Sequence, residues 1–214
     1  MPVTYLTHAA SLQRYDTGAS CPAILDGIWT LIADRSLLSV DTKARFADQI
    51  LPYLQDAYNL ARSLTGNRAD AEDVVQEACL RAYRSLDRVT ISNARAWMLT
   101  IVHNTAYTWL AKNRPRAIVA VSDLEAIERA TAGPDRPAGE TPEASLIAKA
   151  DAAQLDAAIA ELPPQFRETL VLRDVQGLDY KEIATITGVP IGTVMSRLAR
   201  ARERLAAVLR RDVP

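Results

Sequence analysis

Residues 180–204 read YKEIATITGVPIGTVMSRLARARER, a stretch with the pattern of two helices separated by a tight turn. Gly188 falls where the turn needs a permissive backbone, and Pro190 suits the first turn of a new helix. Ala184 falls where the two helices must approach closely. Four apolar side chains are spaced to fill a small shared core: Ile183, Val189, Val194 and Leu198. The stretch therefore predicts a helix-turn-helix over about residues 179–198.

The second of these helices has an apolar side and a basic side. At about 100° per residue, one narrow stripe would face the partner helices: Val194, Leu198, Ala201 and Leu205. On the other side we expect one exposed face: Thr193, Ser196, Arg197, Arg200 and Arg204. Residues 191–211 hold six arginines and one glutamate, a local balance of +5. Such a face suits duplex DNA, whereas a basic helix alone would equally fit a solvated surface; the preceding helix and turn favour DNA.

The composition is that of a globular protein with its charges segregated along the chain. The 214 residues are 49% hydrophobic, have a formal net charge of −1, and are long enough for two small domains. Residues 51–116 carry nine basic and six acidic groups, whereas residues 117–150 carry three and six. A polyanion would therefore meet local basic patches on this protein.

The sequence gives no sign of a metal site, a cofactor or a membrane span. The two cysteines, Cys21 and Cys79, and the two histidines, His8 and His103, lack metal-ligand spacing, and we expect Cys79 to be a small core residue. No run of 18 apolar residues and no signal peptide is visible. We expect a cytoplasmic protein with no membrane insertion, no cofactor and no enzymatic activity, since no catalytic constellation can be assembled.

The periodic segments are helical, so the predicted fold is all-α, with two small helical domains joined by a flexible acidic linker. We expect an N-terminal extension of unknown role over residues 1–42, a first domain over 43–116, a linker over 117–149 and a second domain over 150–211. The linker is placed by its glycines, prolines and acidic setting.

Local signals mark where helices of these domains begin and end. In the first domain, Pro52 predicts an irregularity, Gly66 a helix end and Asp70 the cap of the next helix. A long helix is expected over residues 94–113. In the second domain, a break is expected at residues 162–164, which read Leu-Pro-Pro.

The helix expected over residues 70–86 buries Val74, Val75, Ala78, Ala82 and Leu86 on one side. Its other side carries polar residues around one leucine: Asp73, Gln76, Glu77, Leu80, Arg81 and Arg84. An apolar residue ringed by charges resembles a protein-binding hot spot, but a lone exposed leucine is also common. Periodicity alone leaves both interpretations open.

The helix over residues 94–113 buries Leu99, Val102, Ala106, Trp109 and Leu110 on one side. Its other side and basic end suit single-stranded nucleic acid: Trp97, Thr100, Ile101, Asn104, Thr108, Lys112, Arg114 and Arg116. A ring can stack on a base, an amide can bind an extruded base edge, and cations hold the backbone. Burial of Trp97 in the core is the alternative, and from the residues alone it is favoured.

Several of these segments together resemble a known family. AEDVVQEA at residues 71–78, AWMLTIVHNTA at 96–106, LPPQFR at 162–167 and GTVMSRL at 192–198 look like the extracytoplasmic-function (ECF) group of sigma-70 family bacterial sigma factors. The resemblance covers about residues 44–116 and 150–210. It implies a non-enzymatic subunit that binds core RNA polymerase, directs it to promoters and helps to open them.

The resemblance also implies roles for particular residues. Docking on the β′ clamp coiled coil falls to Asp73, Gln76, Glu77, Leu80 and Arg84. Binding and melting of the −10 element falls to Trp97, Asn104, Thr108, Lys112, Arg114 and Arg116. The −35 duplex is expected to meet Thr193, Ser196, Arg197, Arg200 and Arg204. The helices before this last set are expected to contact the β flap, and an anti-sigma factor is an expected partner.

Two other classes of protein remain as alternatives. One is an interaction protein that mimics a sigma factor and titrates an anti-sigma factor without binding DNA. The arginines at positions 197, 200 and 204 argue against it, since a decoy has no need of a DNA-binding face. The other is an ordinary helix-turn-helix repressor, which the two separate domains disfavour.

Overall fold

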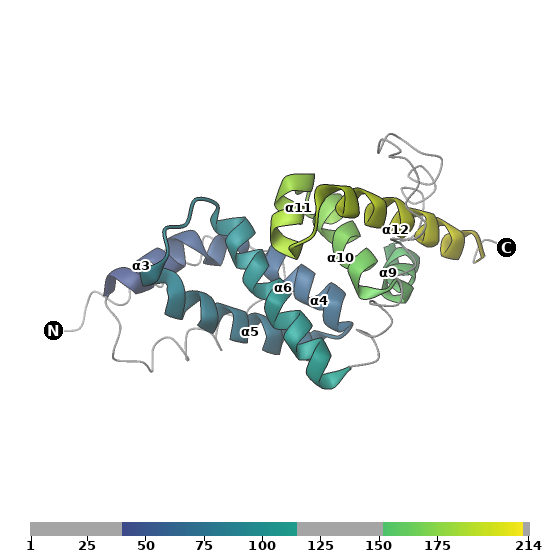
Figure 1. Ribbon diagram of the computed structural model, residues 1–214. Coiled ribbons are helices and arrows are strands. Elements are labelled where there is room, and N and C mark those ends of the chain that lie inside the picture. The colour runs from purple at the N-terminus through teal and green to yellow at the C-terminus, as the bar shows by residue number, and fades with distance from the viewer. Residues whose placement is uncertain (1–39, 115–151, 212–214) are drawn as a thin grey trace.

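The computed structural model describes residues 40–114 and 152–211, and every regular element in these two ranges is helical (Figure 1). This confirms the predicted all-α class. The extension before residue 40, the linker at 117–149 and Arg116 lie outside the described residues. In the first domain the long elements are α3 (Val40–Gln49), α4 (Leu54–Thr65), α5 (Arg68–Ser85) and α6 (Ala94–Asn113). In the second they are α9 (Ala152–Glu161), α10 (Pro164–Leu170), α11 (Tyr180–Thr187) and α12 (Ile191–Arg211).

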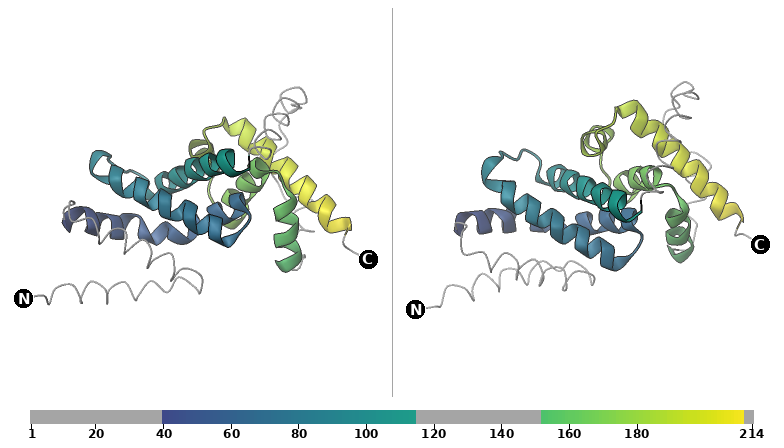
Figure 2. Two further views of the ribbon diagram at one scale, coloured as in Figure 1. Left: turned by 90° about the horizontal axis from the view of Figure 1, so that it is seen from below. Right: turned by 60° about the horizontal axis from the view of Figure 1, so that its bottom comes forward.

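In the first domain, α4, α5 and α6 pack against one another around an apolar core (Figure 2). Pro52 lies in the 3-10 turn Leu51–Tyr53, which separates α3 from α4 and confirms the irregularity expected there. The bulkiest buried side chains of this core are Phe46, Ile50, Leu60, Leu86, Met98, Leu99 and Leu110. The residues predicted to face the core from α5 and the turn after it are all buried: Val74, Val75, Ala78, Ala82 and Leu86. Helical periodicity was therefore sufficient to locate this core.

The turn between α4 and α5 depends on two adjacent residues. Gly66 ends α4 with a φ of 83°, a left-handed conformation that strains residues with a Cβ. Asn67 caps α5, because its side-chain oxygen accepts the N–H of Asp70 at 2.9 Å. The prediction that Asp70 is the cap is wrong. Asp70 lies in the first turn, where its carboxylate is favoured by the positive end of the helix dipole.

The second domain begins with α9 and α10, and the predicted break between them at Leu162–Pro164 is confirmed. Pro164 is the first residue of α10, where its missing N–H costs nothing. After α10 comes a π-helical turn, Val171–Val175, in which the N–H of Gln176 donates to the carbonyl of Val171 at 3.0 Å. Helices α9, α10 and α12 enclose a second apolar cluster: Ala158, Leu162, Phe166, Leu170, Leu198, Ala201, Leu205 and Leu209.

Helices α11 and α12 form the predicted helix-turn-helix. Asp179 and Glu182 cap α11 reciprocally, each side chain accepting the backbone N–H of the other, at 2.8 and 3.0 Å. Gly188 ends α11 with a φ of 70°. Pro190 precedes α12 and its carbonyl accepts the N–H of Val194 at 3.1 Å, so it lies one position before the expected first turn. Of the expected shared core, Ile183, Val194 and Leu198 are buried and Val189 is half-buried.

The two domains also share part of their cores. The apolar cluster of the first domain continues into the second, where it includes Leu172, Leu178, Ile183 and Ile186. Helix α11 packs on α6, and α10 packs on α4, as the two views of Figure 2 show. The sequence predicted a tether between the domains, and the structure adds a direct interface.

We expect Asn67→Ala to lower the free energy of unfolding by about 1 kcal/mol, because it removes the side chain that caps α5. Asp70→Ala removes a first-turn carboxylate, its contact with the Asn67 amide and a surface ion pair with Arg114, and should cost a few tenths of a kcal/mol. Chemical denaturation followed by circular dichroism measures both. A larger loss for Asp70→Ala than for Asn67→Ala would contradict the cap assignment.

Candidate nucleic-acid interface

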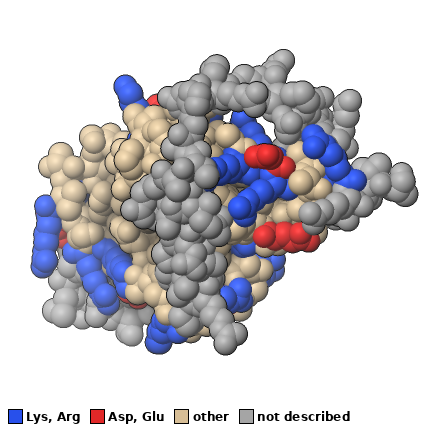
Figure 3. All heavy atoms as spheres, turned by 45° about the vertical axis from the view of Figure 1, so that its right-hand side comes forward, with Lys and Arg blue, Asp and Glu red and all other residues tan. Residues whose placement is uncertain are grey.

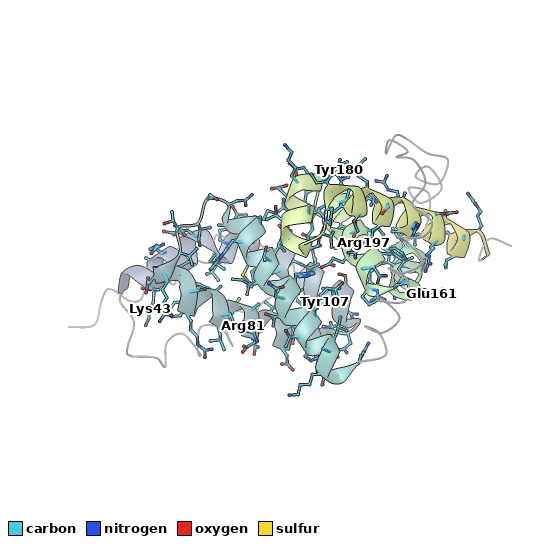
Figure 4. The ribbon with its side chains drawn as sticks, viewed as in Figure 1. Lys43, Arg81, Tyr107, Glu161, Tyr180 and Arg197 are labelled. Atoms are coloured by element: carbon cyan, nitrogen blue, oxygen red, sulfur yellow. The ribbon has the colours of Figure 1, made fainter. Side chains whose placement is uncertain are left out.

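The outer face of α5 carries the leucine and charges expected from the sequence. Asp73, Arg81 and Arg84 are exposed, and Leu80 is half-buried among them. Glu77 accepts a hydrogen bond from Arg81 Nε at 2.8 Å, one turn along the helix (Figure 4). Leu80 therefore presents part of its side chain to solvent, surrounded by charged and polar groups.

Helix α6 presents a polar strip on the side away from its core. Asn104 and Thr108 are exposed, and the Thr108 hydroxyl donates to the Asn104 carbonyl at 2.7 Å. Because Asn104 is exposed, its side-chain amide is accessible to a ligand. Lys112 and Arg114 extend the strip at the end of the helix, where cations are favoured by the helix dipole.

The sequence left open whether Trp97 is buried in the core or exposed to a ligand, and the structure places it between these two arrangements. Its side chain is half-buried and packs partly against the apolar core, so some of its surface stays accessible, two turns before Asn104 on α6. Trp109, expected in the core, is also only half-buried. The Arg114 guanidinium lies 5.7 Å from the centre of the Trp109 ring and 3.9 Å from the Asp70 carboxylate. The basic end of α6 is thus held in place by a cation–π contact and an ion pair.

A polar cleft of about 320 Å³ lies between α3 and the loop that leads to α6. It is lined by Arg45, Gln49 and residues 87–91. Asp87 fixes the start of this loop, because both of its oxygens accept from the Thr42 hydroxyl, at 2.9 and 3.0 Å. Arg45 adds an ion pair to Asp87 at 3.7 Å. The cleft is at the lower end of the volumes that small-ligand sites usually have, roughly 300–1,000 Å³.

Sequence reasoning missed Arg45 and Gln49 as site residues. They are four positions apart on α3 and so share one helix face, but two polar residues at this spacing look like any solvated surface. The side-chain oxygen of Gln49 is buried and makes no hydrogen bond in the structure. It is an acceptor at the cleft wall that a bound donor could satisfy.

The basic side of α12 is more varied than expected. Ser196 and Arg204 are exposed, whereas Thr193 and Arg200 are half-buried. The Arg204 guanidinium lies 4.7 Å from the centre of the Phe166 ring, so it stacks on α10. Figure 3, which brings the second domain forward, shows basic side chains gathered there with a few acidic ones between them.

The expectation that Arg197 belongs to the exposed face is wrong for this structure. Arg197 is 4% exposed and lies on the inner side of α12 (Figure 4). The reason is angular: at about 100° per residue, Arg197 is only about 70° from the middle of the apolar stripe, whereas Ser196 is almost opposite to it. Arg197 therefore lies on the buried side of α12 and Ser196 on the exposed side, and the number of charges on the helix does not reveal this difference.

Arg202, on the same helix, is committed to a partner within the domain. Its guanidinium donates to both oxygens of Asp174, at 2.6 and 3.1 Å. The hydrogen bond to Asp174 raises the pKa of Arg202 further above its ordinary value, against the opposing effect of partial burial. This arginine holds α12 to the π-helical turn and is poorly placed to bind a ligand.

The described residues give little support for a reactive cysteine, a metal site or a membrane-spanning helix. Burial raises the pKa of the Cys79 thiol to about 12, so this cysteine is neutral at physiological pH and behaves as a core residue. Among residues 40–114 and 152–211, no group of three or more His, Cys, Asp and Glu side chains could hold a metal ion. None of the helices described is long and apolar enough to cross a membrane.

Two family models match the chain, one in each domain. Sigma-70 region 2 matches residues 50–116, and Sigma-70, region 4 matches residues 152–205. The chain is 36% identical over 149 residues to the ECF RNA polymerase sigma factor SigE of Mycolicibacterium smegmatis, a match that covers 69% of this chain and 55% of that protein. It is 34% identical over 171 residues to the RNA polymerase sigma-H factor of Pseudomonas aeruginosa, covering 78% and 87%.

The chain is also similar to a solved structure of a sigma factor. The sigma factor RpoE of Bartonella quintana, in complex with the anti-sigma factor NepR, aligns with a TM-score of 0.57 and 27% identity. The alignment covers 78% of this chain and 98% of that one. The chain belongs to the sigma-70 family of bacterial RNA polymerase sigma factors, in the ECF group. Sigma factors are transcription initiation factors and are not enzymes in themselves.

Proposed function

We propose that this chain directs core RNA polymerase to particular promoters and helps to open them through three surfaces. The observation that carries the proposal is that each sigma-70 region matches one domain, and each domain has its own polar face outside the shared core. The three surfaces are the outer face of α5, the strip on α6 together with the cleft at the loop before this helix, and the basic side of α12.

The first surface is a docking site for the polymerase β′ clamp coiled coil. Leu80 supplies an apolar anchor, and the charges around it form a rim that excludes water from the contact. The docking set is Asp73, Gln76, Glu77, Leu80 and Arg84. We assign the β flap contact to α9 and α10, the helices that precede the helix-turn-helix.

The second surface receives the melted −10 strand. Trp97 offers part of its ring for stacking, Asn104 an amide for a base edge, and Thr108 a hydroxyl, while Lys112, Arg114 and Arg116 supply cations for the backbone. The cleft at the loop that leads into α6 has room for an unstacked base, with Arg45 as donor and Gln49 as acceptor. Extruding a base is least costly once the duplex has opened, so capture and melting support each other.

The third surface holds the −35 duplex through Thr193, Ser196, Arg200 and Arg204. Arg197 is left out of this set because it is buried. An anti-sigma factor is a further partner, supported by the complex of the Bartonella relative with NepR. Because core polymerase and promoter DNA are both in the cytoplasm, we place the protein there.

Run-off transcription tests the proposal as a whole. Core RNA polymerase is given fragmented genomic DNA of the source organism, with and without this protein. We expect discrete new transcripts that share upstream sequence elements. If none appears although the protein binds the core enzyme, the promoter-directing function is wrong, and a decoy that titrates an anti-sigma factor becomes the better account.

We expect Leu80→Asp to weaken core polymerase binding by about 30-fold or more, because loss of a hot-spot side chain costs about 2 kcal/mol or more. Fluorescence anisotropy of labelled protein titrated with core enzyme measures the affinity. Ala69→Asp is a matched control, since Ala69 is an exposed residue of α5 outside the docking set. Equal affinities for the two variants would remove the docking assignment.

We expect Arg200→Ala and Arg204→Ala each to lower the salt dependence of −35 duplex binding, reducing the slope of log affinity against log salt by about one. The DNA is the upstream element identified by run-off transcription. Arg202→Ala is the control on the same helix, because its guanidinium is paired with Asp174. A slope that Arg202→Ala reduces as much as the other two would show that the effect is one of general charge.

A further inference from the structure

The first residue of α12 is an isoleucine that the fold leaves in water. Ile191 is 41% exposed, and in the described ranges only two other large apolar side chains are exposed, Val89 at 38% and Val175 at 60%. Removing apolar surface from water is favourable, so this side chain offers surface for a contact outside the chain. None of the polar and basic residues assigned above to the −35 duplex supplies an apolar group at this end of the helix.

The helix-turn-helix does not need Ile191 for its own core. Ile183 of α11 and Val194 of α12 fill that core, and both are 0% exposed. Helix α11 ends at Thr187, so the start of α12 extends past it after the turn (Figure 1). Ile191 therefore lies at an open end of the motif, and its exposure does not serve the packing of the two helices.

The next residue, Gly192, is also unexplained by the fold. A Cβ at this position would meet no atom within 4 Å, and Gly192 is not one of the glycines with positive φ. The space and the backbone would therefore accept alanine, which is a much better helix former. What glycine adds here is the absence of a side chain, which allows another molecule to approach the backbone closely. This second observation is independent of the exposure of Ile191.

The solvent side of α12 has two chemically different edges, one on each side of Ser196. At about 100° per residue, one edge is basic and polar: Thr193, Arg200 and Arg204. The other edge is apolar and follows a spacing of four residues: Ile191, Met195 and Ala199. Ile191 and Ala199 are exposed, and Met195 is half-buried. Cations on one edge suit phosphates, whereas the apolar edge suits the methyl groups of bases.

The position of Ile191 at the start of α12 decides what it meets on DNA. In helix-turn-helix proteins the N-terminal residues of the second helix contact base edges in the major groove. Thymine presents a C5-methyl group there, a partner for an apolar side chain that A, G and C do not offer. We propose that Ile191 is a specificity-determining residue that contacts the methyl group of a thymine in the −35 duplex. Gly192 allows the close approach of the helix backbone that this contact requires.

This inference rests on the proposed contact between α12 and the −35 duplex, and it adds the chemical group that one residue recognises. Ile191 makes no charged contact, so it contributes preference for a base and not general affinity for DNA. The basic edge supplies that general affinity. Substitutions at the two edges therefore have different effects on sequence preference.

Replacement of thymine by uracil tests the contact, because it removes only the methyl group. The full chain first selects duplexes from a random pool, without polymerase, and sequencing identifies the preferred element. Each thymine of that element is then replaced by uracil in turn. Fluorescence anisotropy of the labelled duplexes measures the affinity of the protein for each one.

We expect one thymine whose replacement by uracil weakens binding about three- to fivefold, the effect of burying one methyl group. In Ile191→Ala the thymine and uracil duplexes should bind equally, whereas Ile191→Val keeps a branched apolar side chain and the preference. Val175→Ala, at the other exposed apolar residue of the second domain, is the matched control and should keep the full ratio.

Gly192→Ala separates a role in DNA binding from a role in folding. Because a Cβ has room at this position, the variant should melt at the same temperature as the unsubstituted protein or higher. It should nevertheless bind the selected duplex more weakly, since the added methyl group holds the backbone away from the groove. Circular dichroism measures the melting of all four variants.

Three results would overturn the proposed role of Ile191. They are no enriched duplex, no thymine whose methyl group matters to the unsubstituted protein, and a ratio of thymine to uracil affinity that Ile191→Ala leaves unchanged. The measurement uses no polymerase, so its outcome is separate from that of run-off transcription. Discrete run-off transcripts without a methyl dependence would keep the promoter-directing function and remove only this contact.

Discussion

The position of α6 between the two domains is the constraint on which the rest of the structure depends. Its inner side, with Leu99, Val102 and Ala106, completes the core of the first domain. One flank meets α11 and Glu168 of the second domain, and the side away from the core retains the polar strip around Asn104. A single helix therefore supports a core, an interface and a proposed strand-binding face. Any rotation of α6 about its axis would disturb all three together.

Much of this arrangement could be predicted from the sequence, because it depends on local rules. The helix-turn-helix, the end of α4 at Gly66, the 3-10 turn at Pro52 and the buried side of α5 follow from periodicity and from glycine and proline. The errors concern choices between neighbouring positions. Asn67 and Asp70 are both good caps, and Arg197 lies on a helix angle close to the burial boundary. The contacts of Glu168 and the cleft at Gln49 join residues far apart in sequence, which no periodic pattern records.

Membership of the sigma-70 family gives these surfaces a common purpose. A promoter-directing subunit must bind polymerase strongly, hold duplex DNA by charge and read single-stranded bases by shape, and these tasks need different chemistry. In this chain, the residues proposed for these tasks, Leu80, Arg204 and Asn104, lie on three different helices. Each task can therefore change by mutation without rebuilding the other two.

The stacking of Arg204 on Phe166 has a consequence for how DNA affinity varies. A free arginine side chain loses up to about 2 kcal/mol of rotational freedom when a ligand immobilises it. Phe166 is 0% exposed and already restrains the guanidinium 4.7 Å from its ring, so part of that loss occurs on folding. In the proposed role of Arg204, binding of the duplex therefore depends on the rigidity of a hydrophobic core. If Arg204 has this role, heating or core mutations that loosen Phe166 weaken DNA binding before the domain unfolds.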